Sequence, residues 1–482
     1  MEHGRSQLFI DVISPATERR IGVIPVASAP DVDKAVAAAR RARHSADWSA
    51  IGVSGRARIL NKLADELEAN SDERASLTSG QNGMPILIAR PAEGVAPVAI
   101  LRYYAALAEQ LPSEERRPRV GGDGETIVRR EPVGVVAAVV PWNYPQALTM
   151  FKLAPALAAG CTVVLKPAPE TSLDALELAA AAQRAGIPDG VLGVVTGGAD
   201  VGEYLVSHPG VDKVAFTGST RAGRAIAEVC GRLLRPVTLE LGGKSAAIVL
   251  DDADLSSTAA GLATASLLNS GQTCHLSTRI LAPQSRYDEV VGAVAAMAAS
   301  LPVGDPLDPS TYIGPLVSRR QRERVEQYIQ IGKDSGAKVA YGGGPTDRDI
   351  GWYVQPTVFA GVDNSSQIAR DEVFGPVLTV IPYADVDEAV SIANDSEYGL
   401  GGTIWTSDTE RGLEVARRVE TGSVGVNFYD LDLGAPFGGV KASGLGRELG
   451  PEGLAAYYQL KSIYLRSHPL GAQTDEFVAT NT

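Results

Sequence analysis

The sequence of 482 residues has only three cysteines, Cys161, Cys230 and Cys274, and no Cys-x-x-Cys pair. An odd number of widely spaced cysteines suits neither a disulfide framework nor a zinc site, so we expect no metal centre and a reducing compartment. Long apolar runs are also missing, because none reaches the ~18 residues of a membrane-spanning helix. The first residues lack a basic segment followed by an apolar one. We therefore predict a cytoplasmic protein with no membrane partner.

Positive charge is scarce as well. Lys and Arg together number 44 against 57 Asp and Glu, which gives a formal net charge of −13. This acidic balance argues against nucleic acid as a partner. Glycine is abundant, with 51 residues, and 45% of the chain is hydrophobic. Such a composition is typical of a globular protein with many tight turns, and the length predicts two or three packed units.

Apolar runs alternate with helical patterns between Pro132 and Leu250. Because these runs are apolar throughout, they are typical of parallel strands covered by helices on both faces. Ligands of such a sheet bind outside the carboxyl ends of its strands. Helices are predicted from Ser172 and from Thr220, and the predicted strands are 133–140, 162–166, 191–196 and 211–218.

A second α/β series follows, and helices near the amino end are expected to pack on the first sheet. We therefore predict an α/β fold with two Rossmann-like domains. The predicted helices near the amino end are 33–45 and 56–70, and those of the second series are 254–270, 285–300, 318–336, 385–395 and 408–420. The predicted strands of the second series include 277–283 and 376–383.

The most informative chemistry is a carboxylate and a thiol, Glu240 in ELGGKS and Cys274 in GQTC. A thiol is a good nucleophile only as thiolate, and a carboxylate within reach can take a proton from the thiol or from water. Asn143 in PWNYP could donate a hydrogen bond to an oxyanion, and Glu372 adds a second carboxylate. The set indicates covalent catalysis on a carbonyl. A buried structural cysteine and an asparagine in a turn bounded by prolines are the plainer readings of Cys274 and Asn143.

Together these motifs resemble the aldehyde dehydrogenase superfamily over nearly the whole chain. The motifs occur in the order of that family, and the offset between Glu240 and Cys274 matches as well. They are PWNYP at 141–145, LKPAPE at 165–170, FTGST at 216–220, LELGGKS at 239–245, GQTC at 271–274, EVFGP at 372–376 and PFGGVKASGLGRE at 436–448.

The resemblance implies oxidation of an aldehyde to a carboxylic acid with reduction of NAD, or possible use of NADP. In this reaction Cys274 forms a thiohemiacetal and then a thioester, and Asn143 with the backbone N–H of Cys274 holds the oxyanion. Glu240 activates the water that cleaves the thioester. A cofactor domain is implied over 1–112 and 132–240, and a catalytic domain over 241–459.

The segments 113–131 and 460–482 are then an oligomerisation unit and tail, which predicts a homodimer or homotetramer. From the residues alone, a solvated hairpin at 113–131 fits equally well.

The resemblance also implies which residues contact the cofactor and the substrate. The start of the helix at Thr220, with Gly218 and Gly223, is suited to a pyrophosphate because free N–H groups and the helix dipole attract anions. The other implied cofactor contacts are Trp142 and Ser219 at the phosphates, Lys166 at the adenine ribose, Glu372 at the nicotinamide ribose and Phe374 beside the nicotinamide. The implied lining of an apolar substrate tunnel is Tyr144, Phe151, Phe428 and Tyr429.

Two positions depart from the family pattern. Relatives that prefer NAD commonly have a glutamate three residues after the lysine, where this chain has Pro169 followed by Glu170. His275 follows the nucleophile and raises the alternative of a Cys-His hydrolase. An extended backbone at Cys274 and His275 would turn the two side chains to opposite faces and disfavour that reading. A CoA-acylating enzyme and a non-enzymatic binding protein on the same fold are the remaining alternatives.

Overall fold

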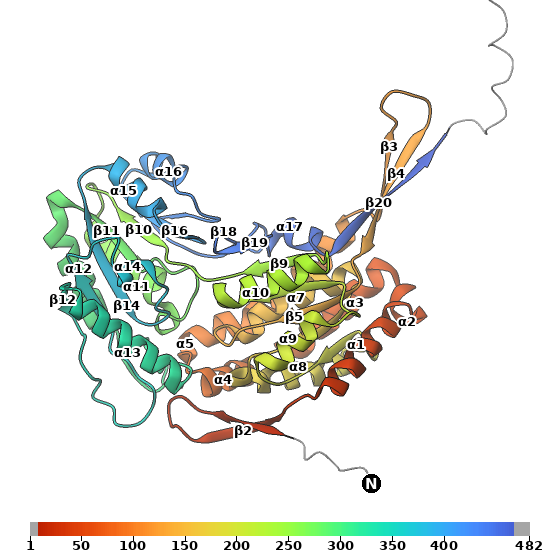
Figure 1. Cartoon of the computed structure of the whole chain (residues 1–482), viewed down its shortest axis with the longest axis horizontal. Helices are drawn as coiled ribbons and strands as arrows, with labels where there is room; N and C mark the ends of the chain where they lie inside the picture. The colour runs from red at the N-terminus through yellow and green to blue at the C-terminus, as the bar shows by residue number, and fades with distance from the viewer. Residues whose placement is uncertain (1–7, 467–482) are drawn as a thin grey trace, which may run out of the picture.

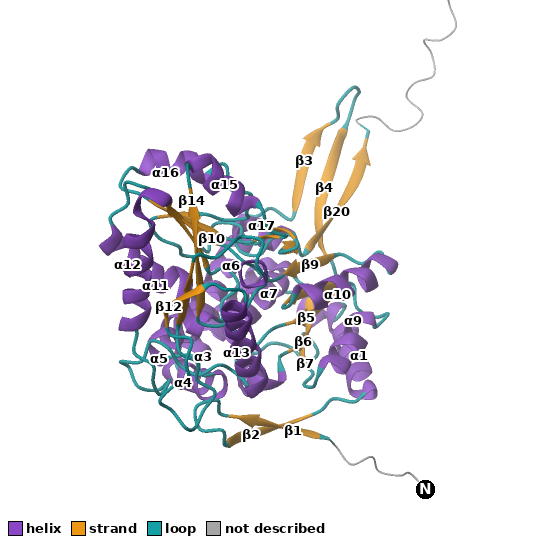
Figure 2. Cartoon of the chain, turned by 60° about the vertical axis from the view of Figure 1, so that its left-hand side comes forward, coloured by secondary structure: helices purple, strands orange, loops and turns teal. Residues whose placement is uncertain are grey.

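The computed structural model describes residues 8–466. The chain forms two α/β lobes and a ribbon of three strands that projects away from them (Figure 1). The predicted α/β class with two parallel sheets is therefore confirmed. In Figure 2 the helices lie on both sides of each sheet, as parallel strands require.

The first sheet has six strands in the order β19-β9-β8-β5-β6-β7. All neighbours are parallel except β19, which runs antiparallel to β9. The central strands are buried apart from Val139, the half-buried last residue of β5, which explains their continuous apolar sequence. The strands are β5 (Val135–Val139), β6 (Thr162–Lys166), β7 (Leu192–Val194), β8 (Lys213–Thr217), β9 (Val237–Glu240) and β19 (Gly444–Leu445).

Two layers of helices cover this sheet, and each layer packs on its own apolar cluster. One layer contains α3 (Gly52–Glu68), α6 (Ala96–Gln110), α7 (Pro145–Ala159) and α8 (Ser172–Arg184). The other contains α1 (Ala29–Arg43), α9 (Ala199–Ser207) and α10 (Thr220–Arg232). Around them lie α2 (Ala46–Ser49), α4 (Ser71–Asn82), α5 (Ile86–Ala89), the π-helix η1 (Arg90–Val95), the 3₁₀ turn η2 (Pro169–Thr171) and α17 (Gly450–Ala455).

The second sheet has seven strands in the order β12-β13-β14-β11-β10-β16-β17, and only β12 is antiparallel to its neighbour. The strands are β10 (Ala246–Val249), β11 (Arg279–Pro283), β12 (Lys338–Tyr341), β13 (Thr357–Ala360), β14 (Val377–Tyr383), β16 (Gly402–Trp405) and β17 (Gly425–Val426). One face carries α11 (Leu255–Leu267) and α12 (Tyr287–Ser300), the latter preceded by η4 (Gln284–Arg286). The other carries α13 (Arg319–Asp334), α14 (Gln367–Arg370), α15 (Val386–Asn394) and α16 (Thr409–Ala416).

The projecting ribbon joins segments that are far apart in the sequence. β4 (Glu125–Pro132) lies between β3 (Glu114–Pro118) and β20 (Tyr458–Leu465), and both pairs are antiparallel. β20 leaves the apolar side chains of Leu460 and Tyr464 68% and 78% exposed. Two short antiparallel pairs complete the fold, β1 (Phe9–Ile13) with β2 (Arg20–Pro25) and β15 (Tyr398–Gly399) with β18 (Val440–Lys441).

Most predicted elements are confirmed, but two predicted helices were too long, and the helices predicted over 33–45 and 56–70 begin earlier, at Ala29 and Gly52. The helix predicted to end at residue 420 stops at Ala416, because the N–H groups of Arg418 and Val419 bond three residues back instead of four. The helix predicted over 254–270 stops at Leu267, where the backbone turns left-handed. The domain boundaries stay a prediction, but β19 returns from the segment assigned to the catalytic domain and completes the first sheet.

Candidate active site

Cys274 follows a sharp reversal of the chain at the end of α11. In the 3₁₀ segment η3 (Leu268–Gly271), Asn269, Ser270 and Gly271 have positive φ angles of 51°, 56° and 77°. Consecutive left-handed residues other than glycine are uncommon and occur mostly where function requires them. Cys274 and His275 lie in the turn that follows. The extended backbone that the sequence analysis assumed at this point is therefore wrong.

Glycines allow the loops of the site to approach backbone to backbone. A Cβ atom built on Gly243, in the loop after Glu240, would overlap the carbonyl oxygen of Cys274. A Cβ atom on Gly271 would overlap the carbonyl oxygen of Gly375, in the EVFGP loop. These motif glycines are thus needed for close packing around the thiol, and any larger residue would push the loops apart.

Asn143 lies two residues before the start of α7, and its side chain reaches the cysteine loop. Its Nδ2 donates to the carbonyl oxygen of Gln272 at 3.0 Å, two residues before Cys274. Its own carbonyl oxygen accepts from Nδ2 of Asn269 at 3.1 Å. The side chain is buried, so the amide is held next to the thiol loop. Asn143 is thus both an asparagine in the bend before a helix, which was the plainer interpretation, and an amide donor next to the Cys274 loop.

Glu240 is the last residue of β9 and is 3% exposed. Neither of its carboxyl oxygens has a hydrogen-bond partner within residues 8–466. Burial raises the pKa of Glu240 well above its usual range, and the charge of Glu448 raises it further. A Cβ atom on Gly438 would lie 2.5 Å from Oε1, so the glycine leaves room for the carboxyl group. Buried carboxyl groups without partners are costly, which makes this one a candidate functional group.

A buried ion pair near Glu240 was missed by the sequence analysis. Nζ of Lys152, on α7, donates to Oε1 of Glu448 at 2.8 Å and to Oγ1 of Thr217 at 2.6 Å. Lys152 is fully buried, and its charge lowers the pKa of Glu240, opposing the effect of Glu448. The signal in the sequence was a single lysine inside the otherwise apolar helical run LTMFKLAPALAA.

The Cys274 thiol is held in its neutral form by its surroundings. Burial raises its pKa above the ordinary value, and the charges of Glu372 and Glu240 raise it further, while backbone N–H groups of Cys274 and His275 oppose them. Any nucleophilic role therefore needs a base or a positive charge near the sulfur.

A cavity of about 580 Å³ lies between α9 and α10 at the carboxyl ends of the first sheet's strands. The helices provide small and apolar walls, including Gly202, Ala222 and Ile226. Gly218, Ser219 and Lys166 line it as well, whereas Gly223 packs on Leu241. The full lining also includes Val139, Val140, Pro141, Ala168, Pro169, Gly198, Ala199, Glu203, Val206, Ser207, Phe216, Thr217, Ala225 and Val229.

The shape and lining of this cavity fit a dinucleotide. The flat adenine ring fits between the apolar walls that α9 and α10 provide. The first turn of α10, which follows Ser219, presents N–H groups to a phosphate. Burial lowers the pKa of Lys166 to about 8, and its Nζ donates to the carbonyl oxygen of Pro167 at 2.9 Å. Pro169 lines the cavity, but Glu170 does not.

The expected nicotinamide contacts lie in the EVFGP loop beside the thiol. Oε1 of Glu372 accepts from the Gly243 N–H at 2.9 Å, and burial raises the pKa of this carboxyl to about 7. Phe374 has a φ of 62°, an uncommon value for a residue other than glycine. Its ring stands edge-on to Trp142 at a centroid distance of 5.4 Å. The structure thus brings together residues from the PWNYP, ELGGKS and EVFGP motifs.

Aromatic side chains surround the other side of Cys274. The hydroxyl groups of Tyr144 and Thr273 are 2.8 Å apart, and Phe151 lies in the apolar cluster against which Cys274 packs. Tyr429 and Phe428 line a cavity of about 130 Å³, where Phe428 is 62% exposed.

His275 belongs to this aromatic set. Its ring stacks on Tyr429 at 4.6 Å with an interplanar angle of 19°, and Phe437 meets it edge-on. Burial lowers the pKa of His275 to about 4, so the imidazole is neutral near pH 7. No hydrogen bond within residues 8–466 joins the imidazole to the Cys274 thiol, which disfavours a Cys-His pair.

The part of the chain that the structure describes contains no group of three His, Cys, Asp or Glu side chains suited to a metal ion. None of its helices has the length and apolar character needed to cross a bilayer.

Comparisons with known proteins agree with this geometry. Residues 2–463 match the family model described as "Aldehyde dehydrogenase family". The chain is 56% identical to a geranial dehydrogenase of Castellaniella defragrans, covering 94% of this chain and 95% of that protein. It is 42% identical to a phenylacetaldehyde dehydrogenase of Pseudomonas fluorescens, covering 96% and 94%.

A solved structure shows the same fold. The crystal structure of a Mycobacterium tuberculosis aldehyde dehydrogenase in complex with NAD⁺ superposes with a TM-score of 0.93 at 45% identity, covering 98% of this chain and 96% of that one. The match extends over both lobes and the ribbon, and the sequence motifs occupy one site. The chain belongs to the aldehyde dehydrogenase family.

Proposed function

We propose that the chain oxidises an apolar aldehyde to the carboxylic acid and reduces NAD⁺, with Cys274 as nucleophile, Asn143 as oxyanion donor and Glu240 as base. The convergence of these groups beside a dinucleotide-sized cavity supports the proposal most strongly. Family membership supports the reaction class. The overall balance is aldehyde, NAD⁺ and water giving carboxylate, NADH and two protons.

The first stage is addition of the Cys274 sulfur to the aldehyde carbon. The thiol proton leaves to a base, for which the Glu240 carboxylate is a candidate, and the carbonyl oxygen becomes an oxyanion. The Asn143 amide and the Cys274 N–H then stabilise that negative charge. When bound, NAD⁺ supplies a positive ring and accepts a hydride from the carbon that carries the sulfur. Cys274 is left as a thioester.

The second stage is hydrolysis of the thioester. Glu240 accepts a proton from water, the resulting hydroxide adds to the thioester carbon, and the Cys274 sulfur leaves with the electron pair of the C–S bond. The raised pKa of Glu240 suits it to this task, since a base works best when its pKa is close to the working pH. The buried Lys152–Glu448 pair tunes that pKa through opposite charges.

The aromatic lining supports an apolar substrate. Tyr144, Phe151, Tyr429 and the neutral His275 offer no charge to pair with an ionic aldehyde. Relatives named for geranial and phenylacetaldehyde fit this preference. Branched unsaturated and arylalkyl aldehydes are therefore the substrates to test first.

The working cofactor is NAD, with measurable use of NADP. The fit of the cavity and the NAD⁺ complexes of related structures support NAD. Pro169, in place of a ribose-binding glutamate, weakens the usual discrimination against NADP.

The assembly is a homodimer or homotetramer in the cytoplasm, joined through the projecting ribbon. Leu460 and Tyr464 on the exposed strand β20 support association, because exposed apolar edges are hazardous unless paired. Light scattering should give a dimer or tetramer at micromolar concentration, and a fully active monomer would contradict this. The unpaired cysteines suit a reducing compartment.

Two variants test the mechanism. Cys274→Ala should abolish aldehyde oxidation while NAD⁺ still binds, and Cys230→Ala, which removes a buried thiol on α10, should remain active. If hydrolysis is the main role of Glu240, Glu240→Gln should give a burst of NADH followed by slow turnover, because hydride transfer precedes hydrolysis. An absent burst in the folded variant would show that Glu240 also takes the thiol proton before hydride transfer. Oxidation by Cys274→Ala would exclude the covalent route. Sustained NADH formation by the wild type only when CoA is added would instead indicate the CoA-acylating alternative.

A further inference from the structure

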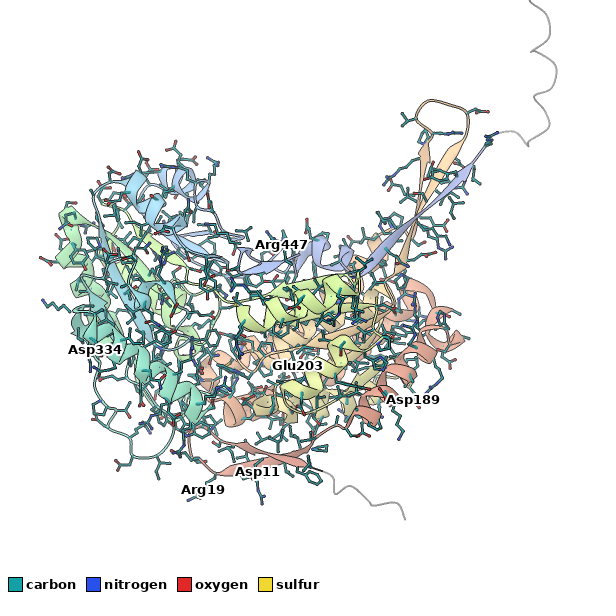
Figure 3. All side chains as sticks on the ribbon, in the orientation of Figure 1. Asp11, Arg19, Asp189, Glu203, Asp334 and Arg447 are labelled. Carbon is teal, nitrogen blue, oxygen red and sulfur yellow. The ribbon has the colours of Figure 1, made fainter. Side chains whose placement is uncertain are left out.

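The charge on the walls of the cofactor cavity is concentrated in two side chains. Among the residues that line it, in the part of the chain described, only Lys166 and Glu203 are ionisable. Lys166 is buried at the end of β6, whereas Glu203 is exposed on α9. Figure 3 shows Glu203 on that helix. A negative and a positive group thus share a cavity whose other walls are apolar or small.

Helix α9 lies directly against the lysine. A Cβ atom on Gly202 would be 3.5 Å from Cδ of Lys166, so no side chain separates the helix from the lysine stem. Glu203 is the next residue, and no cation in residues 8–466 pairs with its carboxylate. Its charge is therefore not neutralised by an ion pair and acts on any ligand held by Lys166.

Other acidic groups face Lys166 from neighbouring elements. Glu170 and Asp200 both favour its charged form. Neither lines the cavity, and Oδ1 of Asp200 lies beside Gly198, 3.0 Å from a Cβ atom built there. Pro169 does line the cavity but has no carboxyl group. Glu203 is thus the acidic side chain with direct access to the ligand.

We infer that Glu203 is the residue that selects NAD over NADP in this chain, an inference that rests on the proposed function. NADP differs from NAD by a phosphate on the adenine ribose, which carries close to two negative charges. Lys166 attracts that phosphate and Glu203 repels it, whereas the ribose hydroxyls of NAD are neutral. Because Glu203 is exposed, its repulsion is screened and the resulting preference is smaller than a buried carboxylate would give.

The test compares cofactor binding to the wild type and to Glu203→Gln, by calorimetry without aldehyde. Glutamine keeps the size of the side chain and a hydrogen-bond acceptor, so the Kd for NAD⁺ should stay within about twofold. The Kd for NADP⁺ should fall about tenfold, because the variant no longer repels the 2′-phosphate. This change in Kd corresponds to about 1.4 kcal/mol of binding free energy. The difference in NADP⁺ affinity between Glu203→Gln and the wild type should become smaller as salt is added, because salt screens the repulsion.

A matched control removes one negative charge elsewhere. Asp189 is exposed in the loop before β7 and lies away from Glu203 (Figure 3). Asp189→Asn should leave both Kd values unchanged, which separates a local effect from a change in net charge.

The outcomes are distinct. An unchanged ratio of the two Kd values in Glu203→Gln would overturn the assignment. The assignment would also be overturned if Asp200→Asn or Glu170→Gln produced the gain in NADP⁺ binding while Glu203→Gln did not. Failure of the wild type to bind either nucleotide would overturn the proposed function itself.

Discussion

The pH dependence of turnover should change when Glu448 loses its charge. Glu448 forms a buried ion pair with Lys152 at 2.8 Å, and after burial its charge is the main cause of the raised pKa of Glu240. Glu240 takes a proton from water only as carboxylate, so turnover falls as the pH drops through its pKa. Glu448→Gln removes the like charge, lowers the pKa of Glu240 and moves the acid limb to lower pH.

The size of this shift follows from the buried setting. A charge within ~4–6 Å changes a carboxyl pKa by about 1–3 units. In the wild type the charges of Lys152 and Arg447 offset part of the effect of Glu448, and in the variant these two positive charges lower the pKa of Glu240 without that opposition. We expect a shift of at least about one unit, or about 1.4 kcal/mol. Glutamine keeps an acceptor for Lys152, so the loss of stability should stay below the ~3–5 kcal/mol of a broken buried pair.

The assay is the steady-state rate of NADH formation after the burst, measured against pH with saturating aldehyde and NAD⁺. Thermal unfolding checks that the variant is folded. Glu452→Gln, on the exposed side of α17, removes a charge four residues away and should leave the profile unchanged. If Glu448→Gln is folded and the acid limb of its pH profile lies at the same pH as in the wild type, Glu448 does not raise the pKa of Glu240.

Three further predictions concern single side chains of the site. Asn143→Ala should lower kcat/KM by about 10²- to 10³-fold with NAD⁺ binding retained, since one oxyanion donor is lost; a loss below tenfold would argue against that role. Affinity for NAD⁺ should rise as the pH increases through about 7, where Glu372 becomes an ionised acceptor for the ribose hydroxyls, and titration calorimetry of Glu372→Gln should show a flat profile. Pro169→Glu should raise the NAD to NADP ratio of kcat/KM, and wild-type rejection of NADP beyond about a thousandfold, roughly 4 kcal/mol, would be more than the exposed Glu203 can give and would show that Glu170 or another acid holds the ribose.

The sheets and most helices could be predicted because their signals are local. The apolar runs that became β5, β6 and β8 record burial on both faces, and Ser219 marks the start of α10 because its side chain caps the helix by accepting from the Ala222 N–H. The candidate residues of the site were predicted from the resemblance, and the structure brings the segments that carry Cys274, Glu240 and Asn143 together. The end of α11 was misjudged because the left-handed turn at Asn269 depends on packing between loops, which no local pattern records.

Pairings between distant segments could not be predicted. Lys152 and Glu448 are 296 positions apart, and only the folded chain places them in contact. The same holds for β19, whose two residues have no strand signal and gain their conformation from the free edge of β9. Glu203 was overlooked for a related reason, since one exposed glutamate on a helix has no special pattern until the cavity beside it is known.

The antiparallel pairing of β19 with β9 has a consequence for biosynthesis. Gly444 pairs with Glu240, and Gly438 leaves the space in which the carboxyl group of Glu240 lies. Domains generally fold from the amino end while the chain emerges from the ribosome. The first sheet is then complete except for its edge strand until nearly the whole chain has been translated. A nascent or truncated chain can contain every residue that lines the cofactor cavity and still lack the strand that pairs with Glu240, so the proposed base has its native surroundings only when synthesis is almost over.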